Sequence, residues 1–134
     1  MLTTKTTLSL PFLEEYTGLL YRELNRNLRK EKRDVKVKGV LKDLNTLKPY
    51  QGKVYRGTSS TAFKACVTGN VFEDKGFLSS SKSPETAAEF TQGRGGKGVF
   101  LTIISKTGKD VSEYSKFPEE EEVIFTPGTK FRVK

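Results

Sequence analysis

Residues 119–125 read EEEEVIF, four glutamates followed directly by three β-prone apolar residues. The apolar part, Val123 to Phe125, predicts a strand. Because side chains along a strand point to alternate faces, we expect Glu120 and Glu122 to project together, while Glu121 points away. An acidic run is more often a solvated turn, so this interpretation depends on the rest of the chain.

Strand signals surround that stretch in the second half of the chain. Short β-prone runs predict strands at residues 53–56, ended by Gly57, and at 99–104 and 131–133. Gly76-Phe77-Leu78 leads into three consecutive serines. Between these runs, Ser83 and Pro84 are typical of the cap and first position of a helix, which ends at the glycine-rich segment 93–98.

The first half of the chain has the pattern of helices. Four leucines recur at spacings of seven, four and four and so share one helical face: Leu13, Leu20, Leu24 and Leu28. We expect Ser9 to cap this helix, with Pro11 in its first turn. A second, shorter helix is expected around residues 40–47, ended by Pro49. Helices first and strands later indicate an α+β fold.

The composition limits the chemistry that is available. The chain has 134 residues, the size of one domain, with a single cysteine and no histidine. Catalysis by Ser-His-Asp or Cys-His groups is therefore excluded, as is a disulfide framework, and we expect no metal. Any reaction must use carboxylates, hydroxyls, Arg, Lys and a bound cofactor.

The chain is strongly basic, with a formal net charge of +8. This charge favours acidic partners, among them nucleic acids, phosphorylated cofactors, anionic lipids and acidic proteins. Lys and Arg are dense in residues 29–38, which would either bind RNA or DNA phosphates or form a solvated face. We find neither a signal-peptide core nor a membrane-spanning stretch, so we expect a soluble protein of a reducing compartment that has no membrane partner.

A pair of carboxylates suits the chemistry of glycosidic bonds. Cleavage at a ribose C1 passes through an oxocarbenium-like cation, which a nearby carboxylate stabilises. A second carboxylate can orient or deprotonate the incoming nucleophile.

Four segments, in this order, carry a resemblance to a known family: YTGLLYRELNRNLR (16–29), VYRG (54–57), GFLSSSKS (76–83) and GKDVSEYSKFPEEEEVIFTPGTKFRV (108–133). Together they resemble the arginine-specific ADP-ribosyltransferases, of the type found in binary actin-modifying toxins and bacterial effector toxins. The resemblance implies N-terminal helices followed by two small, packed, mostly antiparallel sheets that form an NAD cleft. Residues 1–134 would be a single catalytic domain, the toxin domain of a larger effector.

The resemblance also implies roles for the central residues. Arg56, beside Gly57, would hold the NAD diphosphate, for which the fixed fork of a guanidinium is suited. Ser79 would bond and orient Glu122. Glu122 would bind the nicotinamide ribose and stabilise the cation, and Glu120 would engage the acceptor guanidinium.

Further contacts with NAD are implied at the edges of the cleft. Tyr21 and Asn25 lie one helical turn apart and can reach one ligand, or they form a solvated helix edge. Phe90 would lie over the nicotinamide, or it is a core residue. Arg94 would be a second arginine facing the phosphates.

Two departures from the family pattern concern the motifs themselves. Ser80 stands where the family has threonine. The run of four glutamates also leaves Glu119 and Glu121 as an alternative pair. The family places its catalytic glutamate directly before the apolar strand, which favours Glu122.

The function implied is transfer of ADP-ribose from NAD to an arginine of a target protein, with release of nicotinamide and no metal. Water would be the acceptor when no target is present, which gives an NAD glycohydrolase side activity. The alternatives are modification of RNA or DNA and a non-catalytic module that binds NAD or nucleic acid. The protein would be secreted or injected within a larger effector, act in the target-cell cytoplasm and meet a cognate immunity protein.

Overall fold

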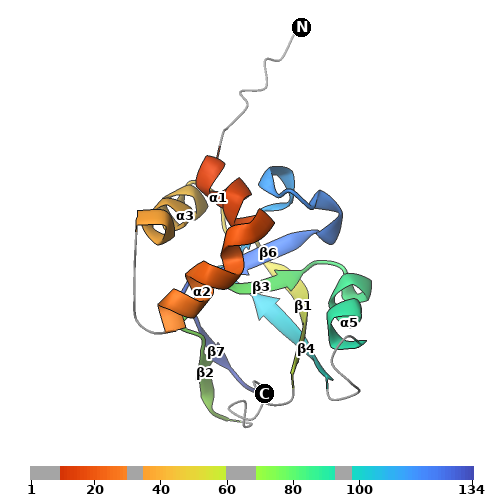
Figure 1. Ribbon diagram of the computed structural model, residues 1–134. Helices are drawn as coiled ribbons and strands as arrows, with labels where there is room; N and C mark the ends of the chain where they lie inside the picture. Colours follow the sequence, from red (N-terminus) through yellow and green to blue (C-terminus); the bar gives the residue numbers. More distant parts are fainter. Residues whose placement is uncertain (1–9, 30–34, 60–68, 93–97) are drawn as a thin grey trace, which may run out of the picture.

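The computed structural model describes residues 10–29, 35–59, 69–92 and 98–134, and it packs helices against a five-stranded sheet (Figure 1). The helical elements are α1 (Pro11–Glu15), the π-helix η1 (Tyr16–Leu20), α2 (Tyr21–Arg29), α3 (Val35–Asn45), α5 (Pro84–Gln92) and two short 3-10 turns, η2 (Ser112–Tyr114) and η3 (Pro118–Glu120). The strands are β1 (Gly52–Ser59), β2 (Val71–Glu73), β3 (Leu78–Ser81), β4 (Gly98–Ser105), β5 (Lys109–Asp110), β6 (Glu122–Phe125) and β7 (Lys130–Arg132).

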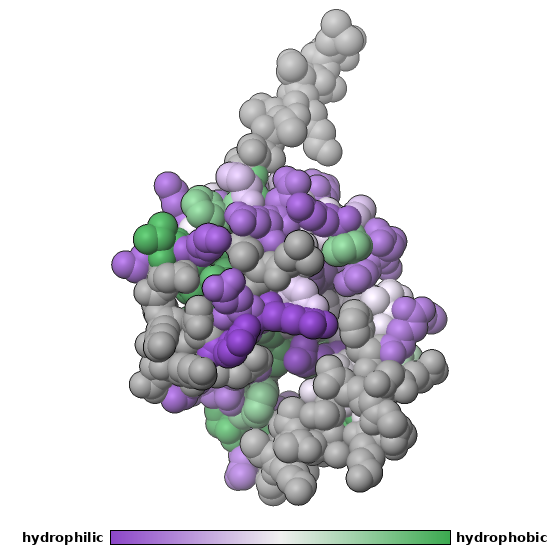
Figure 2. Space-filling model, viewed as in Figure 1, coloured by the Kyte–Doolittle hydropathy of each residue, from purple (hydrophilic) through white to green (hydrophobic). Residues whose placement is uncertain are grey.

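The strands form two antiparallel sheets. The larger has the order β4-β1-β3-β6-β5, and the smaller pairs β2 with β7. Helices that precede two antiparallel sheets confirm the predicted α+β class. On the face shown in Figure 2, hydrophilic residues cover much of the described surface over α2, whereas hydrophobic and hydrophilic residues are mixed over α3. None of the helices in the four described ranges is both long enough and apolar enough to span a bilayer.

The three apolar residues of β6 are consecutive because both faces of this strand are covered. Ile124 faces the helices and belongs to the core cluster that includes Leu13, whereas Val123 and Phe125 face the opposite side. There the Phe125 ring meets that of Phe131 from the smaller sheet, with centroids 5.0 Å apart. All three side chains are at most 2% exposed, because elements cover both faces of the strand.

The first helix is not the single straight helix that its leucine spacing predicts. The π-helix η1 interrupts it, and Figure 1 shows α1 and α2 running in different directions. A wide π turn is a recognised cause of a helix kink. Leu13, Leu24 and Leu28 are buried as the spacing predicts. The predicted cap, Ser9, lies outside the described residues, and Leu10 occupies the N-cap position.

Two further boundaries differ from the predictions. Gly57 does not end β1, because the strand pairs with β4 from Gly52 to Ser59, and glycine keeps its backbone donor and acceptor for that ladder. Helix α3 begins at Val35, before the apolar positions that predicted it. The cap of α5 is confirmed, since the Ser83 hydroxyl accepts a hydrogen bond from the Thr86 amide at 3.3 Å.

Candidate active site

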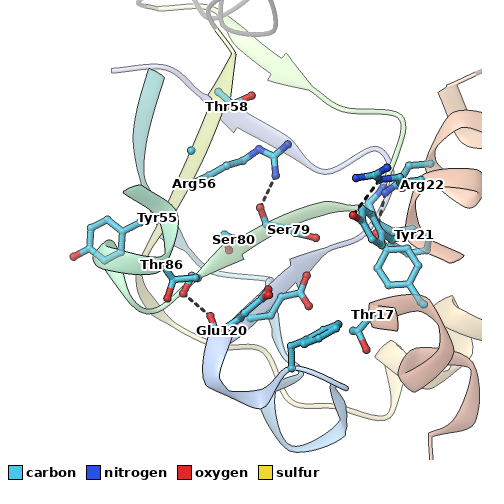
Figure 3. A pocket seen from close by; sticks show the side chains of 18 of the residues that line it. Thr17, Tyr21, Arg22, Tyr55, Arg56, Thr58, Ser79, Ser80, Thr86 and Glu120 are labelled. Carbon is cyan, nitrogen blue, oxygen red and sulfur yellow. Dashed lines mark hydrogen bonds between the residues drawn. The ribbon is translucent and has the colours of Figure 1, made fainter. Parts of the chain in front are cut away.

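A pocket of about 790 Å³ opens between the bent N-terminal helix and the larger sheet (Figure 3). Its walls come from η1 and α2, from β1 and β3, from the start of α5 and from the η3–β6 turn. A volume of this size is typical of sites for small molecules. Segments that are far apart in the sequence therefore meet at one site.

The register between β3 and β6 decides which serine faces the acidic turn. Ser79 pairs with Ile124 and Ser81 with Glu122, so Ser79 is a diagonal neighbour of Glu122 on the same face. Ser79 and Glu122 both line the pocket. Ser81 instead donates to the Glu120 carbonyl at 2.6 Å, so it anchors the 3-10 turn that carries Glu120 to β3.

Glu120 and Glu122 both line the pocket, but not for the reason that strand alternation gives. Glu122 is the first residue of β6, whereas Glu120 lies in η3, so the prediction that one strand holds both is wrong. Pro118 starts the 3-10 turn, and Glu121 ends it with φ 47° and ψ 49°, in the left-handed region. This reversal leaves Glu121 exposed and outside the pocket lining.

The surroundings of Glu122 disfavour a negative charge. Burial raises its pKa to about 7 from an ordinary 4.5, and the nearby charge of Glu120 adds to the rise. The hydrogen bond with Ser79 and the charge of Arg56 act in the opposite direction. Burial likewise raises the pKa of Glu120, helped by Glu119 and Glu89. The two pocket carboxylates therefore form a site that a cationic group would stabilise.

Arg56 lies one residue past the point where β1 pairs with β3 at Tyr55 and Ser81. Its guanidinium donates to the Ser79 carbonyl at 2.7 Å, as Figure 3 shows. Gly57, the next residue along β1, is buried and also lines the pocket. The bond to β3 thus fixes the position of the Arg56 guanidinium at the wall of the pocket.

Asn25 lines the pocket but is occupied by the protein. It is 8% exposed, its Oδ1 accepts from the Phe77 amide at 2.7 Å, and its Nδ2 donates to the Tyr16 hydroxyl at 2.9 Å. Tyr16 is 1% exposed and lines the same pocket, although the sequence patterns did not single it out. The only signal for it is its place at the start of the resembling segment 16–29.

The other expected contacts differ in how far the structure describes them. Tyr21 is 39% exposed at the pocket edge, where its hydroxyl accepts from the Arg22 side chain at 3.2 Å. Arg22 also lines the pocket and was not expected there. Phe90 lies in α5, but its side chain is not described, and Arg94 lies outside the described residues, as do residues 30–34 of the basic run.

The donor set of this pocket is suited to a dinucleotide with a cationic leaving group. Arg56 and Arg22 offer guanidinium donors for phosphates, and two partly desolvated carboxylates lie where positive charge would be stabilised. Within the described ranges, no three His, Cys, Asp or Glu side chains come together as a metal site would require.

Comparisons with known proteins agree with this geometry. The family model described as NAD:arginine ADP-ribosyltransferase matches residues 12–134. Exoenzyme T of Pseudomonas aeruginosa is 34% identical over 127 residues, which cover 88% of this chain and 27% of that protein. The ADP-ribosyltransferase toxin AexT of Aeromonas salmonicida is 33% identical over 126 residues, covering 88% of this chain and 26% of the toxin.

A solved structure gives the same picture. Exoenzyme S from Pseudomonas aeruginosa, in complex with human 14-3-3 protein beta and bound to carba-NAD, aligns with a TM-score of 0.76 and 29% identity. The alignment covers 92% of this chain and 63% of that one. The chain spans only about a quarter of the length of Exoenzyme T and of AexT.

Proposed function

Because the chain belongs to the NAD:arginine ADP-ribosyltransferase family, we propose that it transfers ADP-ribose from NAD to an arginine of a target protein and releases nicotinamide. The observation that carries the proposal is the placement of Arg56, Ser79, Glu120 and Glu122 around one pocket. The toxin and exoenzyme names of its relatives support a role as an effector that is secreted and acts in a target cell.

In this proposal Arg56 anchors the diphosphate, while its bond to the Ser79 carbonyl holds the guanidinium in place. NAD supplies a ribose C1 that becomes electron-poor as nicotinamide departs with the electrons of the C–N bond. Glu122, whose pKa burial raises to about 7, is ionised more readily when a positive charge develops beside it. Its carboxylate then stabilises that charge.

Glu120 is proposed to serve the acceptor. Its carboxylate would accept hydrogen bonds from an incoming guanidinium and take the proton that the nitrogen loses on bonding to C1. The raised pKa of Glu120, caused by burial and then by Glu119 and Glu89, favours proton uptake. Water in place of the guanidinium would give hydrolysis of NAD. The proposal thus includes a glycohydrolase side activity that depends on Glu122 more than on Glu120.

The test is to incubate the purified chain with labelled NAD, with and without a small guanidine acceptor, and to follow free nicotinamide and transferred label. Glu122→Gln should lower both by about 10²–10³-fold, the range for loss of one transition-state electrostatic contact. Glu120→Gln should reduce transfer while keeping most of the hydrolysis. Glu113→Gln, at an exposed position in η2 outside the pocket lining, is the matched control.

Two outcomes would contradict the proposal. The wild-type chain could bind NAD and release no nicotinamide, which would leave only a binding module. Alternatively, Glu122→Gln could keep wild-type turnover, in which case the assigned carboxylate is the wrong one.

A further inference from the structure

The turn that carries Glu120 is held from two walls of the pocket. Near the start of segment 115–121, the Lys116 amide donates to Thr17 Oγ1 at 3.2 Å, a contact between residues 99 positions apart. Near its end, Ser81 of β3 donates to the Glu120 carbonyl at 2.6 Å. Thr17 lies on the helical wall of the pocket and Glu120 on the wall that η3 forms (Figure 3). The segment therefore bridges η1 and the larger sheet.

The Thr17 hydroxyl makes two hydrogen bonds, and their directions are fixed. Its hydrogen is donated to the Glu14 carbonyl at 2.9 Å, one turn earlier in the helix. The Thr17 oxygen then accepts from the Lys116 amide, which can only donate. Thr17 is 8% exposed, so little water reaches this hydroxyl. Removal of the hydroxyl would take away the acceptor that the helix offers to the Lys116 amide.

Gly18, the next residue of η1, permits a close approach between the helix and the segment. A Cβ at this position would lie 3.0 Å from Lys116 Cδ, which is shorter than an ordinary van der Waals contact. The aliphatic stem of Lys116 therefore lies against the backbone of η1. This packing and the bond to Thr17 join the same two parts of the chain.

The two anchors hold different ends of the turn. The sheet holds the end, because the bond from Ser81 is accompanied by one from the Lys82 amide to the Glu121 carbonyl at 3.0 Å. Inside the turn, the Glu120 amide donates to the Phe117 carbonyl at 3.0 Å. The bond to η1 comes immediately before Phe117, so it fixes where the turn begins. Both anchors together determine how the turn faces the pocket.

Glu122 does not share this dependence on the helix. It is the first residue of β6 and pairs with Ser81 of β3. On the other side of the strand, its carbonyl accepts from the Val111 amide at 3.0 Å. Neither contact involves Thr17. Loss of the anchor on η1 should therefore displace Glu120 more than Glu122.

We propose that Thr17 is a positioning residue that holds Glu120 at the acceptor side of the pocket and so sets the ratio of transfer to hydrolysis. The inference rests on the function proposed above, in which Glu120 serves the acceptor and Glu122 the ribose. With the bond to Lys116 in place, the turn keeps the Glu120 carboxylate where it can orient a guanidinium toward C1. Without this bond the turn takes other positions, and water competes better for the same cation.

The experiment compares Thr17→Val, which has the shape of threonine without the hydroxyl, with Thr17→Ser, which keeps the hydroxyl. Each purified variant receives labelled NAD and free arginine, and the ADP-ribosyl-arginine and free ADP-ribose formed are measured. In Thr17→Val the ratio of transfer to hydrolysis should fall about 3–10-fold, the range for loss of one hydrogen bond. In Thr17→Ser it should stay within about twofold of wild type. An unchanged ratio in Thr17→Val, or an equal loss of both products, would overturn the proposal.

Lys116→Pro serves if Thr17→Val folds poorly, because it removes the amide donor and leaves Thr17 intact. The preceding residue, Ser115, has φ −79° and ψ 150°, the extended backbone that a following proline favours. Lys116→Ala keeps the amide and is the matched control, with a ratio within about twofold of wild type. The ratio should fall in Lys116→Pro as in Thr17→Val, and no further in the double variant. Full additivity would overturn the assigned contact.

A measurement without NAD separates this inference from the proposed function. Amide hydrogen exchange, followed by NMR in the ligand-free protein, should be about 3–10-fold faster at Lys116 in Thr17→Val than in wild type. Exchange at Glu120 should become faster as well, while the amides of β6 keep their wild-type rates. Unchanged exchange at Lys116 would overturn the proposal. A wild-type chain that releases no nicotinamide would instead reject the proposed function, because the exchange measurement needs no activity.

Discussion

Replacing Glu122 by glutamine should stabilise the fold, and increasingly so as the pH rises. Burial raises the pKa of this carboxyl to about 7 from an ordinary 4.5, so between these values the folded protein holds a proton that the unfolded chain has lost. Stability rises with pH only where the unfolded state binds more protons. Here the folded state binds more, so the wild type loses stability as the pH rises from 4.5 to 7.

The magnitude follows from the two pKa values. At 1.36 kcal/mol for each unit, the difference between 4.5 and about 7 corresponds to about 3 kcal/mol. Glu122 is partly exposed in the pocket, and solvent screening reduces the effect to roughly 1–3 kcal/mol. Glutamine keeps the shape and a hydrogen-bonding group for Ser79 but carries no charge to desolvate. The gain should therefore be close to zero at pH 4 and reach its full size above pH 8.

The assay is denaturant unfolding of wild type and Glu122→Gln at several pH values from 4 to 8.5. Each kcal/mol corresponds to roughly 3–5 °C in a parallel thermal melt of a domain of this size. Groups that titrate in both proteins cancel in the difference, which leaves the contribution of this carboxyl. A difference that is independent of pH, or that favours the wild type more as the pH rises, would refute the reasoning.

Three further changes probe other contacts. Arg56→Lys should raise KM for NAD about tenfold in steady-state kinetics, because lysine cannot keep the bond to β3 and also offer a fork to a diphosphate. Asp43→Ala should cost about 1–3 kcal/mol in denaturant unfolding, since the buried Leu13 amide loses its acceptor at 3.0 Å. Asp110→Asn should cost under about 1 kcal/mol at pH 7. Burial raises the pKa of Asp110, but its hydrogen bonds, first that from Lys82, outweigh burial and leave the pKa below the ordinary 3.8. The cost should therefore be constant above that value and should shrink in melts as the pH falls below 3.8, until the folded-state carboxyl is protonated.

Local patterns were sufficient where one strong signal dominates a segment. The apolar run of β6 predicted its strand because burial on both faces tolerates no polar residue. Ser83 and Pro84 predicted the start of α5 because a cap is a contact between near neighbours. The short strands β2 and β5 were not predicted, since two or three residues carry too little pattern.

The site was harder to predict because it depends on departures from regular geometry. Strand alternation placed Glu120 in the strand, whereas it lies in the 3-10 turn η3. Alternation assumes an extended backbone, and Glu121 has a left-handed one. The partnership of Tyr16 with Asn25 was not visible at all. In a straight helix these residues would lie about 13 Å apart along the axis and on opposite faces.

The π turn at Tyr16–Leu20 has a consequence for how this pocket would respond to change. A π turn holds one more residue than the α turn it replaces, so the contact between Tyr16 and Asn25 depends on chain length as well as on side chains. Deleting one residue from this turn would restore a regular helix and separate the two partners, although neither is altered. The pocket is thus sensitive to insertions and deletions in this segment, a dependence that a scan of substitutions alone would overlook.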